Sequence, residues 1–524
     1  MNFAARLIRR KSVEQLQAEA DQSHDFRRTM GVWQLTAIGI GAIVGVGVFV
    51  LAPHQAALNA GPAIVISFLI AGVGSACAAL SYAEFAGMIP VTGSAYTYGY
   101  AVLGELPAWI IGWDLLIEYA LIVGVVAAGS SNYLQALITQ ITGWHLPVAL
   151  QGAYDPANPH GAHVFNLIAA VIALAIAWLQ TRRTQMGARF NTVVVTAKVI
   201  GVIAVVCVGA FYVDPANWIP FVPSTINHAG GATSYGWSGV LAASSIVFFA
   251  VFGYDTLTTA AEESKNPQRD LPLAVIASLA VAMGMYLAIS LVLTGMVPYN
   301  ACVGSGVPGH CQSMILSAPA PVSAVFQARG LNWVSGVINV AAVCGIISVV
   351  FAFMLGAARI WFALARDGLL PGWFAKPHPK HGTPHRPTWV LGFFTAFVAG
   401  VLPIREIAEL VNIGTLSAFI LICASVLILR IRRPDLERRF RTPVLWLLAP
   451  LGIIFSLFLI IGWPWADQYG WRLIGGLPFV TIARFIVWML IGFVIYFSFG
   501  IRHSRVQREE APEPTRAENA GVNR

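Results

Sequence analysis

A few ionisable side chains lie inside long apolar runs of this sequence, where a charge is costly. Lys198 lies in the middle of one run, and Asp114 and Glu118 lie four residues apart in another. Asp255 lies in a third run, two residues after Gly253. Amines and carboxylates in apolar surroundings either exchange protons or hold neighbouring segments through fixed hydrogen bonds. The chemistry to consider is therefore proton transfer and ion binding.

Lys198 has two interpretations. It is too far from either end of its run to reach water by extending its side chain. A structural ammonium would pair permanently with backbone carbonyls, whereas a titrating amine would carry a proton during a functional cycle. Because lysines at membrane depth are usually functional, its position favours the second interpretation.

The acidic residues also have alternative roles. Asp114 and Glu118 share one helix face, because residues four apart in a helix are neighbours. They either accept hydrogen bonds from adjacent helices or contribute to a proton path, for which the deeper Glu118 is the better candidate. Asp255 is placed to cap a helix that begins after Gly253, and we expect capping rather than a chemical role.

Two of the apolar runs carry signs of an interrupted helix. The first run has four glycines within nine residues, at Gly39, Gly41, Gly45 and Gly47. Glycines there either allow close helix packing or mark an unwound segment whose amides hold an anion. The sixth run has Gly253 beside the intramembrane acid Asp255. Paired interruptions at matching positions are typical of secondary transporters, and an offset of five runs predicts a five-plus-five inverted repeat with discontinuous helices 1 and 6.

The composition sets the fold class of the elements that carry these residues. The 524-residue chain is 57% hydrophobic and 11% charged, with a mean hydropathy of +0.71. Soluble domains carry roughly a quarter charged residues. The composition excludes a soluble enzyme, a disordered chain and a disulfide scaffold, and the long unbroken runs exclude a β-barrel. We predict an all-α integral membrane protein with about twelve transmembrane helices. They start near Val32, Pro62, Pro107, Val164, Phe190, Trp237, Leu271, Trp333, Thr388, Ile407, Val444 and Leu477.

The positive charges predict the orientation of these spans. With the N-terminus inside, 27 of the 32 Lys and Arg residues fall in inside segments and three fall in outside loops. Because inside loops of membrane proteins are enriched in Lys and Arg, both termini are predicted to be cytoplasmic. We expect a cytoplasmic tail over residues 1–30, one transmembrane domain over 31–502 and a second cytoplasmic tail over 503–524. The net charge of +8 then needs no nucleic acid to explain it.

Cysteine and histidine residues give weaker signals. Cys302 and Cys311 share one predicted outside loop, and their pairing in a disulfide is left open. Three histidines, His378, His381 and His385, lie in a Pro-rich inside loop, where solvated side chains are favoured over a weak metal site. We found no compact zinc motif such as His-Glu-x-x-His and no nucleotide-binding loop. We therefore expect no enzyme activity, no cofactor and no metal site.

Five segments, each at its expected span, resemble the amino acid–polyamine–organocation (APC) transporters, and specifically the bacterial branch of the cationic amino acid transporter family. The resemblance covers about residues 30 to 500, and the segments are Gly39–Phe49, Gly112–Tyr119, Phe248–Glu263, Asn266–Pro272 and Ala365–Pro371. The resemblance implies an amino acid permease with the LeuT-like broken-helix fold and alternating access.

The resemblance also implies a substrate site at the two interruptions. By analogy, the substrate carboxylate meets the amides of Val46 and Gly47. The substrate amine meets the carbonyls of Ile43, Phe249, Ala250 and Phe252, and Phe249 resembles the aromatic gate.

The same resemblance implies the coupling residues. Lys198 resembles a lysine whose ammonium replaces a sodium ion beside the first interruption, and Glu118 resembles a carboxylate linked to proton coupling.

The chain departs from the family pattern at two of these positions. Val46 stands where family members often carry Thr or Ser, so a hydroxyl contact to the carboxylate is missing. Phe252 is bulkier than the aliphatic residue often found there, and it either narrows the pocket or points away from it. No acidic residue is placed to hold a guanidinium, which favours neutral amino acids.

The main functional prediction is proton-coupled amino acid uptake (proton symport) across the bacterial inner membrane. An amino acid or amine exchanger without net proton coupling is the alternative. A sensor would need an output domain, and discontinuous helices with an isolated lysine make a poor cation channel. The expected partners are the amino acid, protons and the lipid bilayer, with no nucleic acid. A small membrane protein as a further partner is left open.

Overall fold

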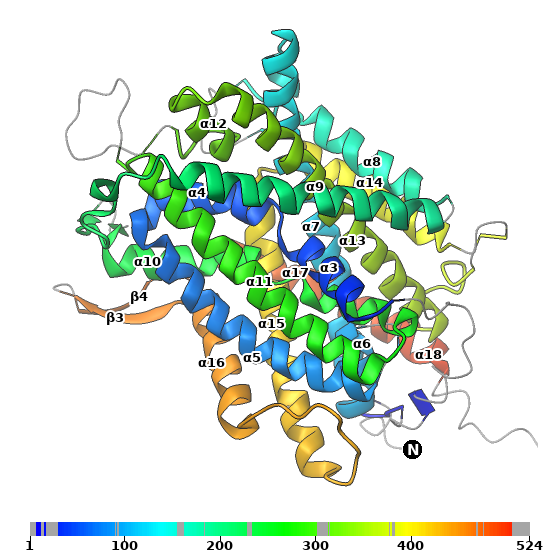
Figure 1. The fold of residues 1–524 in the computed structure, drawn as a ribbon. Helices are drawn as coiled ribbons and strands as arrows, with labels where there is room; N and C mark the ends of the chain where they lie inside the picture. The colour runs from blue at the N-terminus through cyan, green and yellow to red at the C-terminus, as the bar shows by residue number, and fades with distance from the viewer. Residues whose placement is uncertain are drawn as a thin grey trace, which may run out of the picture.

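Helices make up nearly all of the structure (Figure 1). The computed structural model describes residues 7–11, 15–16, 30–89, 91, 94–154, 162–182, 184–227, 233–300, 313, 315–376, 378–379, 383–467, 470–474 and 476–505. The all-α fold class predicted from composition is confirmed. Cys302 and Cys311, whose pairing the sequence leaves open, and His381 lie outside the described residues.

In the first half of the chain, α9 is the long helix that crosses the face of the molecule in Figure 1. In chain order they are α3 (Val32–Ile43), η1 (Gly47–Leu51), α4 (Ala52–Gln55), η2 (Ala56–Ala60), η3 (Gly61–Ala63), α5 (Ile64–Met88), α6 (Ser94–Val102), α7 (Glu105–Thr142), η4 (Val148–Leu150), α8 (Leu167–Gln180), α9 (Thr184–Ala210) and η5 (Pro215–Trp218).

The second half contains the helices from α10 to α18 and two short antiparallel strand pairs. Its helices are α10 (Gly236–Val247), η6 (Phe248–Ala250), η7 (Tyr254–Glu263), α11 (Pro267–Met296), α12 (Pro321–Ala328), α13 (Asn332–Arg366), α14 (His385–Val401), α15 (Ile404–Arg432), α16 (Leu445–Ile461), α17 (Phe479–Ile495), η8 (Tyr496–Gly500) and α18 (Ile501–His503). The antiparallel strand pairs are β1 (Ile226–Asn227) with β2 (Thr233–Ser234), and β3 (Trp463–Asp467) with β4 (Gly470–Ile474).

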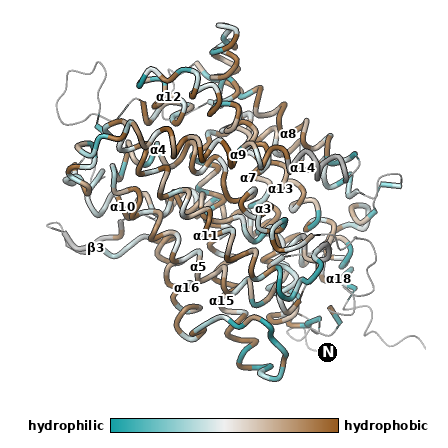
Figure 2. Tube along the Cα trace, viewed as in Figure 1, coloured by the Kyte–Doolittle hydropathy of each residue, from teal (hydrophilic) through white to brown (hydrophobic). Residues whose placement is uncertain are grey.

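Eight described segments are long and apolar enough to cross a membrane, and α3, α8 and α16 are shorter apolar helices. Figure 2 shows hydrophobic residues along the helices, with hydrophilic residues gathered at the turn between α15 and α16 and around α18. A helix begins within a few residues of each of the twelve predicted starts. The chain is thus a multi-pass membrane protein, and the exact number of spans stays a prediction. Helices α6 and α12 and both strand pairs were not predicted.

In three of the close helix pairs, the two members are five spans apart in the predicted order. Helix α5 lies along α11, α7 along α13, and α8 along α14. Segments of both predicted tails also pack on this helical body. Lys11 pairs with Asp367 just after α13 at 3.0 Å, and Ser504 donates to Glu105 at the start of α7 at 2.6 Å. These tail segments therefore belong to the folded domain.

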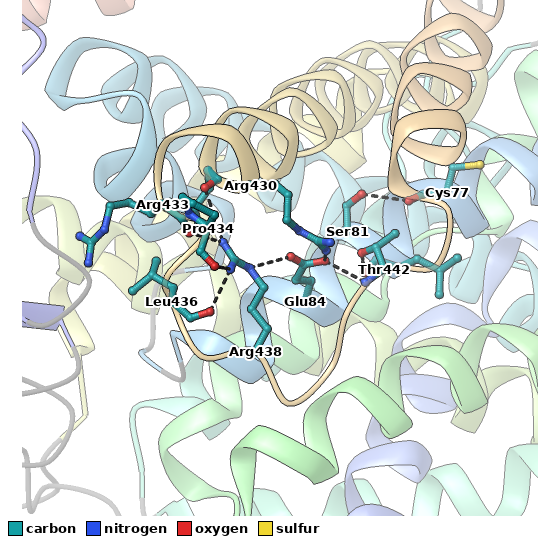
Figure 3. A network of polar contacts seen from close by, with 11 residues as sticks. Cys77, Ser81, Glu84, Arg430, Arg433, Pro434, Leu436, Arg438 and Thr442 are labelled. Atoms are coloured by element: carbon teal, nitrogen blue, oxygen red, sulfur yellow. Dashed lines mark hydrogen bonds and ion pairs between the residues drawn. The ribbon is translucent and has the colours of Figure 1, made fainter.

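A buried ion network fixes α5 against α15 and the turn that follows it (Figure 3). Glu84 on α5 accepts from Arg430 at 2.6 Å and from the Thr442 amide at 2.8 Å. Its other oxygen lies 3.2 Å from Nε of Arg438, and the Glu84 and Arg438 side chains are each only 2% exposed. Arg438 also donates to the carbonyl of Arg433 at 2.8 Å, beyond the end of α15. Burial and the neighbouring arginines lower the pKa of Arg438, while Glu84 opposes that shift.

The substitution Glu84→Gln should destabilise this network. It leaves Arg438 buried without a counter-charge, and breaking a buried pair costs about 3–5 kcal/mol. We expect a clearly lower Tm in detergent. The matched control is Asp435→Asn, which removes an ion pair to Arg433 whose side chains are 62% and 41% exposed. That change should leave the Tm nearly unchanged, because exposed ion pairs contribute little to stability. Equal Tm values for the two variants would show that the network does not stabilise the fold.

Candidate functional site

The first apolar run is interrupted at Val44. Helix α3 ends at Ile43, and Val44 is extended, with φ −74° and ψ 102°. Helical structure resumes at η1, where no side chain caps the N-terminal end at Val46. The predicted discontinuity of this helix is confirmed. Amide groups at such an end carry partial positive charge and suit an anion.

The glycines of the first run serve packing as well. A Cβ atom at Gly39 would lie 2.7 Å from Ser278 of α11, and one at Gly41 would lie 3.0 Å from Val195 of α9. One at Gly45 would lie 2.9 Å from Val349 of α13, and one at Gly47 would lie 2.6 Å from Cα of Ala250. The four positions therefore face four different elements. The sequence left close helix packing and an unwound segment as alternative roles for these glycines, and the structure shows both.

The sixth run is interrupted beside the first. Helix α10 ends at Val247, η6 makes one 3₁₀ turn, and η7 starts after Gly253. Gly253 has φ +119°, a conformation that a side chain would disfavour. A Cβ atom there would lie 3.1 Å from the Ala42 carbonyl oxygen. The two interruptions thus touch each other at Gly253 and at Gly47.

The backbone carbonyls of the two interruptions differ in their partners. On the first helix, Ile43 accepts from the Tyr286 hydroxyl at 2.9 Å. On the sixth, the Phe252 carbonyl accepts no hydrogen bond within the described ranges, and no amide outside the helical turns donates to the carbonyls of Phe249 and Ala250. All three residues are at least 94% buried. Buried carbonyls normally have partners, so this group of acceptors points to a ligand with N–H or O–H donors.

Lys198 reaches the first interruption from α9. Its Nζ atom donates to the Gly41 carbonyl at 2.6 Å, to the Val44 carbonyl at 2.7 Å and to Ser348 Oγ at 3.0 Å. The side chain is fully buried. An ammonium has three donors, and all three are matched here. Gly345 on α13 makes room for the lysine, because a Cβ atom there would lie 2.7 Å from the Lys198 side chain.

The structure places Glu118 with the other acids and not with Lys198. Glu118 Oε1 accepts from the Thr415 hydroxyl of α15 at 2.7 Å. Asp114 faces the same helix, since a Cβ atom at Gly414 would lie 2.8 Å from its Oδ1. Asp255 does not cap η7 as expected. Gly253 is the capping position, without a side-chain cap, and Asp255 accepts from the Tyr119 hydroxyl instead.

The aromatic residues of the sixth helix point into an aromatic cluster. The Phe252 ring lies 5.5 Å from that of Phe249 and 6.3 Å from that of Phe353 on α13. Val46 packs into the space that Gly129 leaves on α7. Both departures from the family pattern are thus accommodated by neighbouring helices.

Several residues of the site were not recognised in the sequence. Tyr286 and Ser348 complete the partners of the first interruption, and Tyr119 binds Asp255. The only signal was a hydroxyl within an apolar helix, and such residues are common. Their partners lie far away in the chain, so no local pattern could identify them.

The interrupted, mutually contacting helices define a membrane permease rather than an enzyme. A family model described as "Amino acid permease" matches residues 30–500. The chain belongs to this family within the APC superfamily.

Three relatives show the range of the family. The branched-chain amino acid permease BcaP of Bacillus subtilis is 42% identical over 503 residues, covering 96% of this chain and 99% of that protein. The methylthioribose transporter of Bacillus subtilis is 40% identical over 502 residues, covering 96% and 99%. The vacuolar cationic amino acid transporter 4 of Arabidopsis thaliana is 32% identical over 431 residues, covering 82% and 68%.

The substitution Gly47→Ala should separate the two interruptions. The added methyl group would meet both Cα and Cβ of Ala250, which leaves no room without a backbone shift. We expect a lower Tm and loss of ligand binding. Gly284→Ala in α11 is the matched control, since a Cβ atom there meets nothing within 4 Å and alanine favours a helix by about 1 kcal/mol. A Gly47→Ala protein with the stability and binding of the control would contradict this packing.

Proposed function

We propose that the protein is a secondary active amino acid transporter that takes up its substrate with protons by alternating access. The observation that carries this proposal is the contact between two interrupted helices. One has an uncapped N-terminal end, and the other has a carbonyl, that of Phe252, which accepts no hydrogen bond within the described ranges. Such paired interruptions form the binding sites of many secondary transporters.

A zwitterionic amino acid fits the polarity of the two interruptions. In the proposed mode, the amides of Val46 and Gly47 bind the carboxylate, because the start of a helix favours an anion. The carbonyls of Phe249, Ala250 and Phe252 bind the ammonium group, and Phe249 acts as the gate. Ile43 contributes its carbonyl as well. Although it already accepts from Tyr286, a carbonyl oxygen can accept two hydrogen bonds.

The helix pairs support the proposed inverted repeat. If twelve spans cross the membrane, α5 with α11, α7 with α13 and α8 with α14 join span n to span n plus five. The two interrupted spans have the same offset and contact each other. This arrangement is expected of two equivalent halves related by an axis in the membrane plane. We propose a bacterial plasma membrane location with both termini inside.

The surroundings favour a neutral, apolar side chain on the substrate. Val46, Phe249 and Phe252 are apolar and buried, and Asp255, the acid that follows on the sixth helix, is bound to Tyr119. A cationic side chain would lack a counter-charge there. The name of the 42% identical relative, a branched-chain amino acid permease, agrees with this choice. The 40% identical methylthioribose transporter makes that neutral sugar a competing candidate.

Proton coupling is assigned to Lys198 and Glu118. The Lys198 site can hold either protonation state, because the Ser348 hydroxyl can accept from an ammonium or donate to a neutral amine. In both forms the lysine can hold the Gly41 and Val44 carbonyls. Deprotonation would reverse its hydrogen bond with Ser348, whose hydroxyl otherwise donates to the Gly345 carbonyl at 2.7 Å. An amine in this place also argues against sodium coupling. An exchanger that ignores the proton gradient remains the alternative.

Uptake by the purified protein in liposomes tests the proposal. The panel would contain labelled leucine, isoleucine, valine, alanine, arginine and methylthioribose, with and without an inward proton gradient. We expect gradient-stimulated uptake of the branched-chain amino acids. Uptake that requires internal amino acid and ignores the gradient would establish the exchanger, and uptake of methylthioribose alone would overturn the amino acid assignment.

The substitution Lys198→Ala should abolish pH-dependent transport while the protein still folds and binds substrate. The variant removes the Nζ group that joins α9 to the carbonyls of both Gly41 and Val44. Tm and ligand binding check the fold, and uptake between pH 5 and pH 8 checks the function. Lys265→Ala, at an exposed lysine beyond η7, is the control. Full activity with an unchanged pH profile would leave Lys198 with a structural role only.

A further inference from the structure

Three acidic side chains, Asp114, Glu118 and Asp255, are buried in the interior of the membrane domain. Two come from α7 and one from η7, and none is more than 2% exposed. Asp114 and Glu118 lie one helical turn apart and both face Gly414 of α15, and Tyr119, next to Glu118, donates to Asp255. We call these three residues the acid cluster.

Each carboxyl of the acid cluster has one oxygen without a partner. These are Oδ1 of Asp114, Oε2 of Glu118 and Oδ1 of Asp255. Within the described part of the chain, no ion pair joins any of the three to a lysine or arginine. The same part contains no three acidic, histidine or cysteine side chains placed to hold a metal ion.

Three unpaired negative charges are untenable in these surroundings. A carboxylate at membrane depth loses its hydration, and neighbouring carboxylates repel one another. With no lysine or arginine paired to them in the described part of the chain, binding a proton is the way in which these groups can lose their charge. The arrangement therefore favours bound protons on the acid cluster.

The hydroxyl partner of Glu118 suits a group that gains and loses a proton. Thr415 Oγ lies 2.7 Å from Glu118 Oε1 and 3.1 Å from the Val411 carbonyl. It can donate to an ionised Glu118, or accept from a protonated one while donating to Val411. Neither state leaves this hydroxyl unsatisfied.

The ionisable neighbours of the acid cluster add little charge of their own. Among the described residues they include Tyr82 on α5, near Asp255 and Glu118, and Tyr254 on η7, near Asp255. Tyr98 on α6 and Cys423 on α15 lie next to these two tyrosines. The ordinary pKa values of tyrosine and cysteine lie above neutral pH. Arg359 donates to the Thr259 carbonyl at 3.0 Å, further along η7.

A continuous column of aromatic rings joins the acid cluster to the second interruption. Phe249 contacts Phe252, Phe252 contacts Phe353, and Phe353 lies 5.1 Å from Tyr119. The Tyr119 hydroxyl then donates to Asp255. Gly356 on α13 admits the Tyr119 ring, since a Cβ atom there would lie 2.7 Å from it.

We propose that Asp114, Glu118 and Asp255 form one proton-binding site, and that Tyr119 positions Asp255 in response to the aromatic column. The idea rests on the proposed function and deepens it, because it gives Glu118 two partners and connects them to the substrate-binding interruption. Displacement of Phe249 or Phe252 by a substrate side chain would press on Phe353 and Tyr119. The Tyr119–Asp255 hydrogen bond would then change, and with it the stability of the bound protons.

Infrared spectroscopy of the purified protein in lipid nanodiscs tests the site without transport. Protonated carboxyl groups give a carbonyl band separate from that of carboxylates. We expect this band at neutral pH, and we expect Asp114→Asn, Glu118→Gln and Asp255→Asn each to change its position or intensity. Glu406→Gln at the start of α15 should not change it, because Glu406 lies outside the acid cluster and pairs with Arg484 at 2.7 Å. An absent band, or one that any of the three variants leaves unaltered, would overturn the site.

The substitution Tyr119→Phe tests the link to the interruption. It keeps the ring and removes the bond to Asp255, so the infrared band should shift. Leucine uptake should fall at least tenfold with an altered pH profile and an unchanged Tm. Tyr496→Phe, which removes a bond to Glu105, is the matched control. A band and a pH profile like those of the control would overturn the role of Tyr119.

The two kinds of failure are distinguishable. Gradient-independent transport by a protein with the expected band and variant effects would refute proton coupling and leave the protonated site in place. Gradient-driven transport by a protein without the band would refute the acid cluster alone.

Discussion

Backbone amides and carbonyls at membrane depth need partners within the protein, because no water reaches the hydrocarbon core. Interrupting two helices at that depth leaves such groups without their helical partners, and other helices must supply new ones. On the first helix, Lys198 donates to the carbonyls of Gly41 and Val44, and Tyr286 donates to that of Ile43. The glycines around that break let α9, α11 and α13 approach closely enough to deliver them.

The same constraint separates two electrostatic centres. The positive centre, Lys198, lies between the first interruption, α9 and α13, and its contacts are backbone carbonyls and a hydroxyl. The negative centre lies between α7, η7 and α15, with hydroxyl partners from Thr415 and Tyr119. No hydrogen bond or ion pair joins the two centres among the described residues. Both contact the interrupted helices, so movement of these helices is the route by which the centres can influence each other.

The sequence predicts the parts of this arrangement that depend on local composition. Apolar length places the helices, and the glycine-rich run and Gly253 locate the interruptions. It does not predict that the first break falls at Val44 or that Tyr286 occupies the Ile43 carbonyl. It also does not predict the Glu84–Arg430–Arg438 network. These features pair residues up to several hundred positions apart, and such pairs depend on helix packing that hydropathy does not encode.

The difference between the two interruptions bears on the choice of substrate. Other helices supply donors to the first helix, whereas the Phe252 carbonyl of the sixth has none within the described residues. An ammonium group brings three donors and a charge, and each hydrogen bond to a charged group contributes about 1.5–3 kcal/mol. A neutral sugar hydroxyl brings one donor, at about 0.5–1.5 kcal/mol per bond. Since unpaired buried carbonyls are costly, the better match is the amine of an amino acid, and its arrival would stabilise the contact between the two helices.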